Sequence, residues 1–180
     1  MKRSGVLALF PLLVFAGLAW ALGKGVNQPV EPALVGQLDR PLPEFVLSPL
    51  PGTESGFSSQ DLEGKVVLIN VFASWCSVCR AEHDKLLDLA ASQPVPVYGI
   101  NWKDAKGAGT LFLNRFGNPY VATGDDPAGV LGSQLGVTGV PETLIVDADG
   151  RIRYRHLGEL TDEVWTGILQ PLLSELEAES

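Results

Sequence analysis

The sequence predicts an α/β domain, and three features of its pattern support that fold class. An apolar, β-branched run over residues 66–72 predicts a buried strand, and leucines at helical spacing follow it. A second apolar strand is predicted over residues 95–101, with a helix over about 106–116 after it. A hairpin and a final helix complete the predicted pattern, which alternates strands with helices as layered α/β folds do.

Shorter elements are predicted before the first of these strands. Residues 45–47 predict an edge strand, residues 49–52 a turn, and residues 59–62 a helical turn. Residues 24–43 are rich in proline and glycine, which predicts a tether with little regular structure. We therefore expect a folded domain over residues 44–180.

The second half of the chain predicts a short helix, a β-hairpin and a last helix. Their expected ranges are 126–136 for the short helix, 143–146 and 151–156 for the hairpin strands, and 161 onward for the last helix. The turn of the hairpin is predicted by the sequence Asp-Ala-Asp-Gly at 147–150. Pro171 predicts a kink in the last helix, because proline cannot donate a backbone hydrogen bond.

The N-terminus has the pattern of an export signal. Lys2 and Arg3 precede an uncharged run from Gly5 to Gly23, which is close to the ~20 residues that a bilayer span requires. The small residues around position 20 also fit a cleavage site, so the sequence leaves processing open. We expect an uncleaved signal anchor or transmembrane helix over residues 1–23, with its charged end in the cytoplasm.

Composition restricts the function. The chain has 180 residues, is 46% hydrophobic and carries a formal net charge of -8, which argues against a nucleic-acid partner. Its two cysteines, Cys76 and Cys79, leave no others for a framework of structural disulfides.

The cysteine pair lies where the buried strand turns into a helix. At a helix start, free backbone N–H groups and the helix dipole stabilise a thiolate on Cys76, and the three-residue spacing allows a disulfide with Cys79. We expect Cys76 to attack and Cys79 to resolve. The alternatives are an inert structural pair, and a metal site built from both cysteines and His83 with a fourth ligand such as His156.

Motifs along the chain resemble those of the thioredoxin superfamily, and in particular the membrane-anchored thiol-disulfide reductases of cytochrome c maturation (DsbE/CcmG type). The segments that carry the resemblance are 70–76, 79–83, 101–104, 117–120, 139–143 and 152–156. It implies a thioredoxin-like fold, with a central mixed β-sheet flanked by helices. It also implies a cis-proline loop at Val140-Pro141, which would bind an extended peptide together with Trp75; an ordinary trans proline and a plain core tryptophan are the alternatives.

Two acidic residues are candidates for tuning the cysteine chemistry. Glu82 lies one helical turn beyond Cys79, and Glu142 follows the expected cis-proline. Negative charge near the sulfurs would raise the thiol pKa and favour a reductant, whereas solvated surface acids would have no such effect. Many thioredoxins carry a buried aspartate where this chain has Asn70, so Glu82 is the candidate for proton transfer.

Together these features predict a periplasmic thiol-disulfide reductase that is held in the bacterial inner membrane and needs no cofactor. The resemblance implies electrons from a membrane thiol donor of the DsbD/CcdA kind. It also implies, as substrate, the haem-binding cysteines of apocytochrome c or another cytochrome c maturation protein. The alternatives are a general periplasmic oxidant or isomerase, and a metal-binding assembly module using Cys76, Cys79 and His83.

Overall fold

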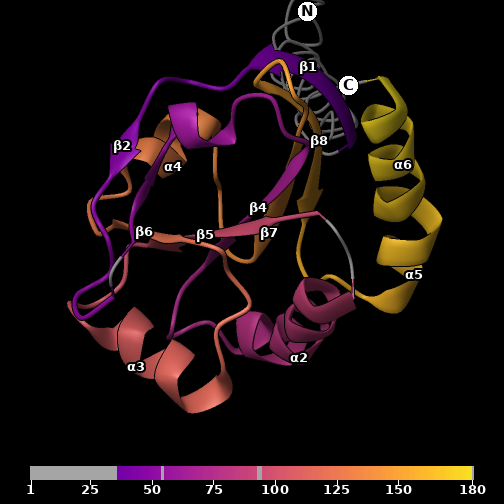
Figure 1. Ribbon diagram of the computed structural model, residues 1–180. Helices are drawn as coiled ribbons and strands as arrows, with labels where there is room; N and C mark the ends of the chain where they lie inside the picture. The colour runs from indigo at the N-terminus through magenta and orange to yellow at the C-terminus, as the bar shows by residue number, and fades with distance from the viewer. Residues whose placement is uncertain (1–35, 54, 93–94, 180) are drawn as a thin grey trace, which may run out of the picture. The chain divides into compact units, whose positions relative to one another are not determined.

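The computed structural model describes residues 36–53, 55–92 and 95–179, which fold around a six-stranded mixed sheet (Figure 1). The strand order is β1-β8-β7-β4-β5-β6. The strands are β1 (Gly36–Pro41), β4 (Val67–Phe72), β5 (Val97–Trp102), β6 (Thr123–Asp126), β7 (Glu142–Val146) and β8 (Arg151–Leu157). Strands β4, β5 and β6 are parallel, while β7 and β8 form an antiparallel hairpin that joins the sheet beside β4.

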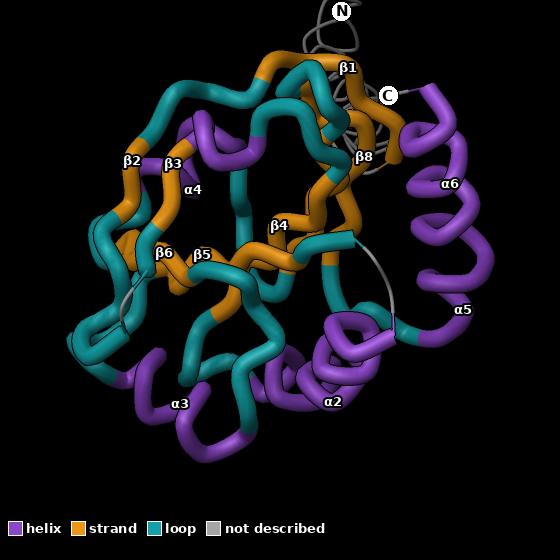
Figure 2. The backbone as a smooth tube through the Cα atoms, in the orientation of Figure 1, coloured by secondary structure: helices purple, strands orange, loops and turns teal. Residues whose placement is uncertain are grey.

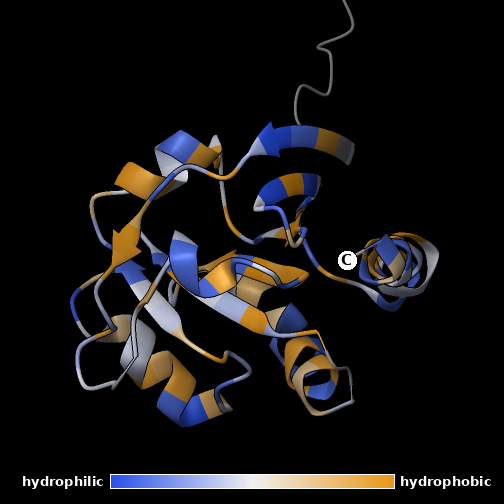
Figure 3. Cartoon of the chain, turned by 45° about the horizontal axis from the view of Figure 1, so that its top comes forward, coloured by the Kyte–Doolittle hydropathy of each residue, from blue (hydrophilic) through white to orange (hydrophobic). Residues whose placement is uncertain are grey.

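Helices and a small second sheet cover the two faces of this sheet (Figures 1 and 2). One face is covered by α2 (Ser77–Ser92), α3 (Ala108–Phe116) and α6 (Gln170–Glu179). The other is covered by α4 (Val130–Leu135), the 3-10 turn η1 (Ser59–Leu62) and the hairpin of β2 (Val46–Leu47) with β3 (Phe57–Ser58). Hydrophobic and hydrophilic residues alternate along the helices, as one buried side requires (Figure 3).

The central strand β4 shows why the site forms at this place. All six of its residues are buried, as expected of a strand covered on both faces. Leu68 and Phe72 belong to the core beneath α2, and Val67, Ile69 and Val71 belong to the core beneath α4. Because side chains alternate along a strand, Asn70 points to the α2 side with Leu68 and Phe72. A polar side chain is therefore buried directly below the cysteine helix.

The predicted fold class is confirmed, and so are most of the predicted elements. The tether prediction is wrong at its end, because residues 36–41 form β1, an edge strand that pairs antiparallel with β8. The proline and glycine content of this segment led to the tether prediction, but proline is tolerated at the end of an edge strand, where Pro41 lies. Strand β6 was also missed, because its residues, Thr123-Gly124-Asp125-Asp126, lack the apolar pattern of a strand.

The sequence predicts a kink at Pro171, and the structure has a change of helix type just before that residue. It begins with α5 (Asp162–Val164), where Thr161 caps the end by accepting the Val164 N–H at 3.3 Å. A π-helical segment, Trp165–Leu169 (η2), then precedes α6. Proline has no N–H to complete the regular pattern, so the widened turn adjoins Pro171.

The expected anchor over residues 1–23 and the first part of the expected tether lie outside the described residues. Within the part of the chain that the structure describes, no helix has both the length and the hydropathy needed to cross a bilayer.

Candidate active site

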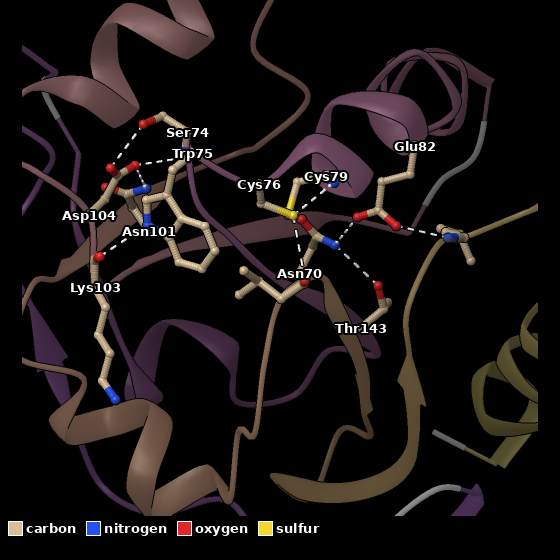
Figure 4. Close-up of a disulfide and its surroundings, with 12 residues drawn as sticks. Asn70, Ser74, Trp75, Cys76, Cys79, Glu82, Asn101, Lys103, Asp104 and Thr143 are labelled. Atoms are coloured by element: carbon tan, nitrogen blue, oxygen red, sulfur yellow. Dashed lines mark hydrogen bonds between the residues drawn. A yellow bond between two sulfur atoms is a disulfide. The ribbon is translucent and has the colours of Figure 1, made fainter.

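Cys76 and Cys79 form a disulfide at the junction of β4 and α2 (Figure 4). Cys76 immediately precedes the helix, and its carbonyl oxygen accepts the Arg80 N–H at 3.2 Å. The Cys79 N–H points at the Cys76 Sγ, 3.0 Å away. The two Cα atoms are 5.3 Å apart, a separation typical of disulfides. Cys76 thus lies where a thiolate would accept a backbone hydrogen bond and face the positive end of the helix dipole.

The two cysteines differ in accessibility. Cys76 is 6% exposed and Cys79 is 2% exposed, so a partner would reach Cys76 first. The Val140 carbonyl oxygen lies 3.4 Å from the Cys76 Sγ, and the Val140-Pro141 peptide bond is cis, as predicted. The loop before β7 therefore contacts the disulfide at its more accessible sulfur.

Trp75 is not a core residue, so that alternative is wrong. Its side chain is among the exposed large hydrophobic groups, at 58%, and lies next to Cys76 in the chain. The indole Nε1 donates to the Lys103 carbonyl oxygen at 3.1 Å (Figure 4). Trp75 is therefore held at its polar edge and leaves its apolar surface accessible beside the disulfide.

Glu82 is buried on α2, 1% exposed, so the solvated-acid alternative is wrong for it. One carboxylate oxygen accepts the Asn70 Nδ2 at 2.9 Å, and the other accepts the Leu160 N–H at 2.8 Å (Figure 4). Burial raises the pKa of Glu82 to about 7, against the opposing effect of these two hydrogen bonds. A carboxyl group that titrates near neutral pH thus lies one helical turn from Cys79.

Asn70 connects Glu82 to a buried polar network. Its Nδ2 also contacts the Thr143 Oγ1 at 3.2 Å, and its Oδ1 accepts the Tyr120 hydroxyl at 2.7 Å. Burial raises the pKa of Tyr120 well above its usual value, so its hydroxyl remains a donor at neutral pH. Asn70 itself carries no titratable proton and acts here by holding Glu82.

We expected Glu142 to lie near the sulfurs, but its carboxylate contacts other groups. Glu142 is buried, and one of its oxygens accepts the Arg155 Nε at 2.9 Å and Nη2 at 2.5 Å. The other accepts the N–H groups of Thr138 and Gly139 at 2.9 and 3.2 Å. Side chains alternate along β7, and Thr143 points to Asn70, so Glu142 points to the opposite face.

Several residues of the site were not predicted from the sequence. Arg155 lies in the hairpin and neutralises Glu142, but an arginine in a strand usually faces water. Tyr120 was noted only as part of a motif, and its distance of fifty positions from Asn70 gave no signal of their contact. Asp104 was noted in the same way, and its carboxylate accepts the Ser74 N–H at 2.6 Å.

The contacts of His83 do not support the alternative metal site. Its Nε2 donates to the Gly117 carbonyl oxygen at 3.0 Å, and its ring packs edge-on against Phe112. Burial is the main cause that lowers the pKa of His83. Among the described residues, no three His, Cys, Asp or Glu side chains are grouped so that they could hold a metal ion.

A cysteine pair at the start of a helix, a cis-proline loop against the sulfur, and a mixed sheet between helices define a thiol-disulfide oxidoreductase of the thioredoxin fold. The profile of the Redoxin family matches residues 37–167. The chain belongs to this family, and within it to the DsbE-type thiol:disulfide interchange proteins.

Relatives support this assignment over the full chain. The thiol:disulfide interchange protein DsbE of Escherichia coli K12 is 40% identical and covers 100% of this chain and 99% of its own length. DsbE of Allochromatium vinosum is 38% identical, with 98% of each chain covered. A solved DsbF homologue from Corynebacterium diphtheriae aligns with a TM-score of 0.66 at 25% identity, over 81% of this chain and 96% of its own.

Proposed function

We propose that this protein is a membrane-anchored periplasmic thiol-disulfide reductase of cytochrome c maturation. In this proposal it reduces the haem-binding cysteines of apocytochrome c, or the disulfide of another maturation protein. The observation that carries the reductase proposal is the Cys76–Cys79 disulfide at the start of α2, with the buried carboxyl group of Glu82 one turn further along. The cytochrome substrate comes from the DsbE/CcmG resemblance.

The exchange begins from the reduced protein. The Cys76 thiolate attacks one sulfur of the substrate disulfide, the substrate S–S bond breaks, and its second sulfur leaves as a thiolate that takes up a proton. Cys79 then loses its proton and attacks the Cys76 Sγ of the mixed disulfide. The substrate leaves with both of its cysteines reduced, and the protein is left in its oxidised form, with the Cys76–Cys79 disulfide. Two electrons have passed to the substrate, and a membrane dithiol donor restores them.

Glu82 is the proposed acceptor of the Cys79 proton. Its pKa of about 7 lies below the ~8.5 of an ordinary thiol, so the transfer is uphill by only about 2 kcal/mol. Once ionised, its negative charge disfavours a nearby thiolate and therefore destabilises the reduced dithiol. A less stable reduced form is a stronger reductant, which supports reduction over oxidation as the direction of the reaction.

The loop at Val140-Pro141 is the proposed peptide-binding element, together with Trp75. The backbone of Val140 already contacts the Cys76 Sγ, so a substrate strand that pairs with this backbone would bring its own disulfide to the same sulfur. Glu142 and Arg155 brace this loop, because Glu142 accepts backbone N–H groups on its N-terminal side. We therefore assign Glu142 to the loop and leave the tuning of the thiols to Glu82.

The N-terminal sequence and the resemblance support the proposed location. The uncharged run to residue 23 would anchor the chain in the inner membrane, and a tether would join it to the domain. A donor of the DsbD/CcdA kind in the same membrane would then be within reach of Cys76.

The reduction potential tests the proposed direction. We expect a value near that of thioredoxin, ~-270 mV, or lower, measured on the full chain in dithiothreitol buffers. A value near the ~-120 mV of a strong oxidant would contradict the reductase and favour the oxidant alternative. Glu82→Gln should raise the potential, whereas Glu175→Gln, an exposed glutamate on α6, should leave it unchanged.

Trapping tests the order of attack and the substrate. Cys79→Ala should accumulate a mixed disulfide between Cys76 and the substrate in cells, because the resolving thiol is missing. Cys76→Ala is the matched control and should trap nothing. Recovery of an apocytochrome c or a maturation protein would support the proposed pathway. Trapping through Cys79 in the control would reverse the assigned roles.

A further inference from the structure

The loop that follows β5 contacts the two residues before Cys76. The Lys103 carbonyl oxygen accepts the Trp75 indole N–H at 3.1 Å. Asp104 accepts the Ser74 N–H at 2.6 Å through one oxygen and the Ser74 hydroxyl at 2.9 Å through the other (Figure 4). Two consecutive loop residues therefore hold two consecutive residues of the active-site turn.

The Asp104 contacts require a carboxylate. Besides its two bonds from Ser74, Asp104 accepts the Asn101 Nδ2 at 3.0 Å and the Ala105 N–H at 2.8 Å. Each of its oxygens thus faces two donors. An amide in place of the carboxylate would turn its own N–H₂ group toward one of these donor pairs. The carboxylate is also buried, so water would not readily replace the lost acceptor.

The backbone of Lys103 is strained at the point where it contacts Trp75. Its φ is 47°, and among the described residues it is the one non-glycine with a positive φ. Its N–H donates to the Asp126 carbonyl oxygen at 3.0 Å, while its own carbonyl accepts from Trp75. A left-handed residue persists only where its surroundings impose it, and such residues gather at functional sites. Here the left-handed turn directs the Lys103 carbonyl toward the indole.

Trp75 is fixed and accessible at once. Its N–H is bound, yet 58% of its surface is exposed next to Cys76. Val78, one helical position before Cys79, is also exposed, at 41%. A rigid aromatic group offers a large apolar contact and loses little conformational freedom on binding, because that freedom is already lost in the free protein.

We propose that Lys103 and Asp104 are positioning residues that hold the Trp75 indole as a docking platform for an apolar side chain beside the disulfide of a polypeptide substrate. The proposal rests on the proposed function, because it requires a polypeptide disulfide as substrate. The proposal predicts different behaviour for two kinds of substrate. A polypeptide with an apolar flank contacts the platform, whereas a small disulfide reaches Cys76 without it.

The variants change the backbone of Lys103 and the acceptor of Asp104 separately. Lys103→Val opposes the left-handed conformation, because valine is β-branched, and should move the carbonyl from the indole. Lys103→Asn also removes the positive charge but tolerates a positive φ, so it should retain the wild-type behaviour. Lys106→Val, in the same loop at a residue without positive φ, is the matched control. Asp104→Asn removes one of the carboxylate acceptors beside Ser74, and Trp75→Phe removes the indole N–H that donates to Lys103.

The assay compares two oxidised substrates with the reduced full chain. One is a synthetic peptide with an internal Cys-x-x-Cys disulfide flanked by leucines, and the other is bis(2-hydroxyethyl) disulfide. Lys103→Val, Asp104→Asn and Trp75→Phe should lower the rate constant on the peptide about 3- to 10-fold, the range that one aromatic contact supports. Their rates on the small disulfide should fall less than their rates on the peptide, and an unchanged midpoint of urea denaturation shows that each variant is folded.

An independent readout is the solvent exchange of the Trp75 indole proton, assigned by its loss in Trp75→Phe. It should be faster in Lys103→Val than in Lys103→Asn, because only valine displaces the acceptor. Equal peptide rates in wild type and all variants, with the wild type active, would overturn the platform and leave the reductase intact. Parallel losses on both substrates would assign the loop a purely structural role. A wild type that reduces only the small disulfide would overturn both proposals.

Discussion

Replacing Glu82 with glutamine should change how the stability of the oxidised protein depends on pH. The pKa of Glu82 is raised from 4.5 to about 7 by burial, so the folded protein holds a proton that the unfolded chain releases between these values. The stabilisation by this proton is fully present below about pH 4.5 and is lost as the pH rises through 7. A shift of this size corresponds to about 3 kcal/mol in the free energy of unfolding.

The measurement is urea denaturation from pH 4 to 8 with the disulfide intact, so that neither cysteine titrates. Other groups titrate in this range, and His83, whose pKa is lowered by burial, gives the opposite slope. The relevant quantity is therefore the difference between wild type and Glu82→Gln at each pH. Glutamine also turns an N–H₂ group toward Asn70 or Leu160, but that cost is constant with pH.

We expect the wild type to lose about 3 kcal/mol relative to Glu82→Gln between pH 4.5 and 7, and no further slope above about pH 8. The exposed variant Glu175→Gln is the control and should follow the wild type. A difference curve that is flat from pH 4 to 8 would refute the assignment of a neutral pKa to Glu82. It would also remove the basis for its role as proton acceptor.

Two further predictions concern stability, and both are measured by urea denaturation at pH 7. Arg155→Met should lower the free energy of unfolding by about 3–5 kcal/mol, because it leaves the buried Glu142 charge unpaired. The double variant Arg155→Met/Glu142→Gln should recover part of this loss. Strictly additive effects of the two substitutions would contradict the pairing. Gly99→Ala should cost about 1–3 kcal/mol, because the new Cβ would lie 2.7 Å from the ring of Tyr120. Gly167→Ala should instead gain about 0.5–1 kcal/mol, because the new Cβ would meet no atom within 4 Å apart from the adjoining backbone of its own helix; equal effects at the two glycines would contradict the packing argument.

Local patterns in the sequence were sufficient to predict the chemistry of the cysteine pair. The spacing of Cys76 and Cys79, between a buried strand and a helix, predicts the disulfide and its place at the helix start. The hairpin of β7 and β8 was predicted because its turn and its alternating strands are also local signals. The cis bond before Pro141 came from the resemblance rather than from any physical signal in the sequence.

Local signals in the sequence did not predict the two edge strands. Strand β1 forms because β8 offers it a partner, and β6 forms because β5 does, although neither sequence has a strong strand pattern of its own. For such segments the hydrogen bonds of the neighbouring strand outweigh local preference. The tether was therefore predicted too long, and β6 was not predicted.

The sequence by itself determined which groups carry the reaction, because a dithiol at a helix start is specified by residues that are neighbours in the chain. The tertiary structure alone decided what the acidic groups do. Glu82 and Glu142 have the same side chain, and each was a candidate for tuning the thiols. Glu82 is buried on the cysteine helix and accepts hydrogen bonds from two uncharged groups, whereas Glu142 is paired with Arg155 on the opposite face of the sheet. A carboxylate acquires its pKa and its role from the groups that surround it, and folding brings those groups from distant parts of the chain.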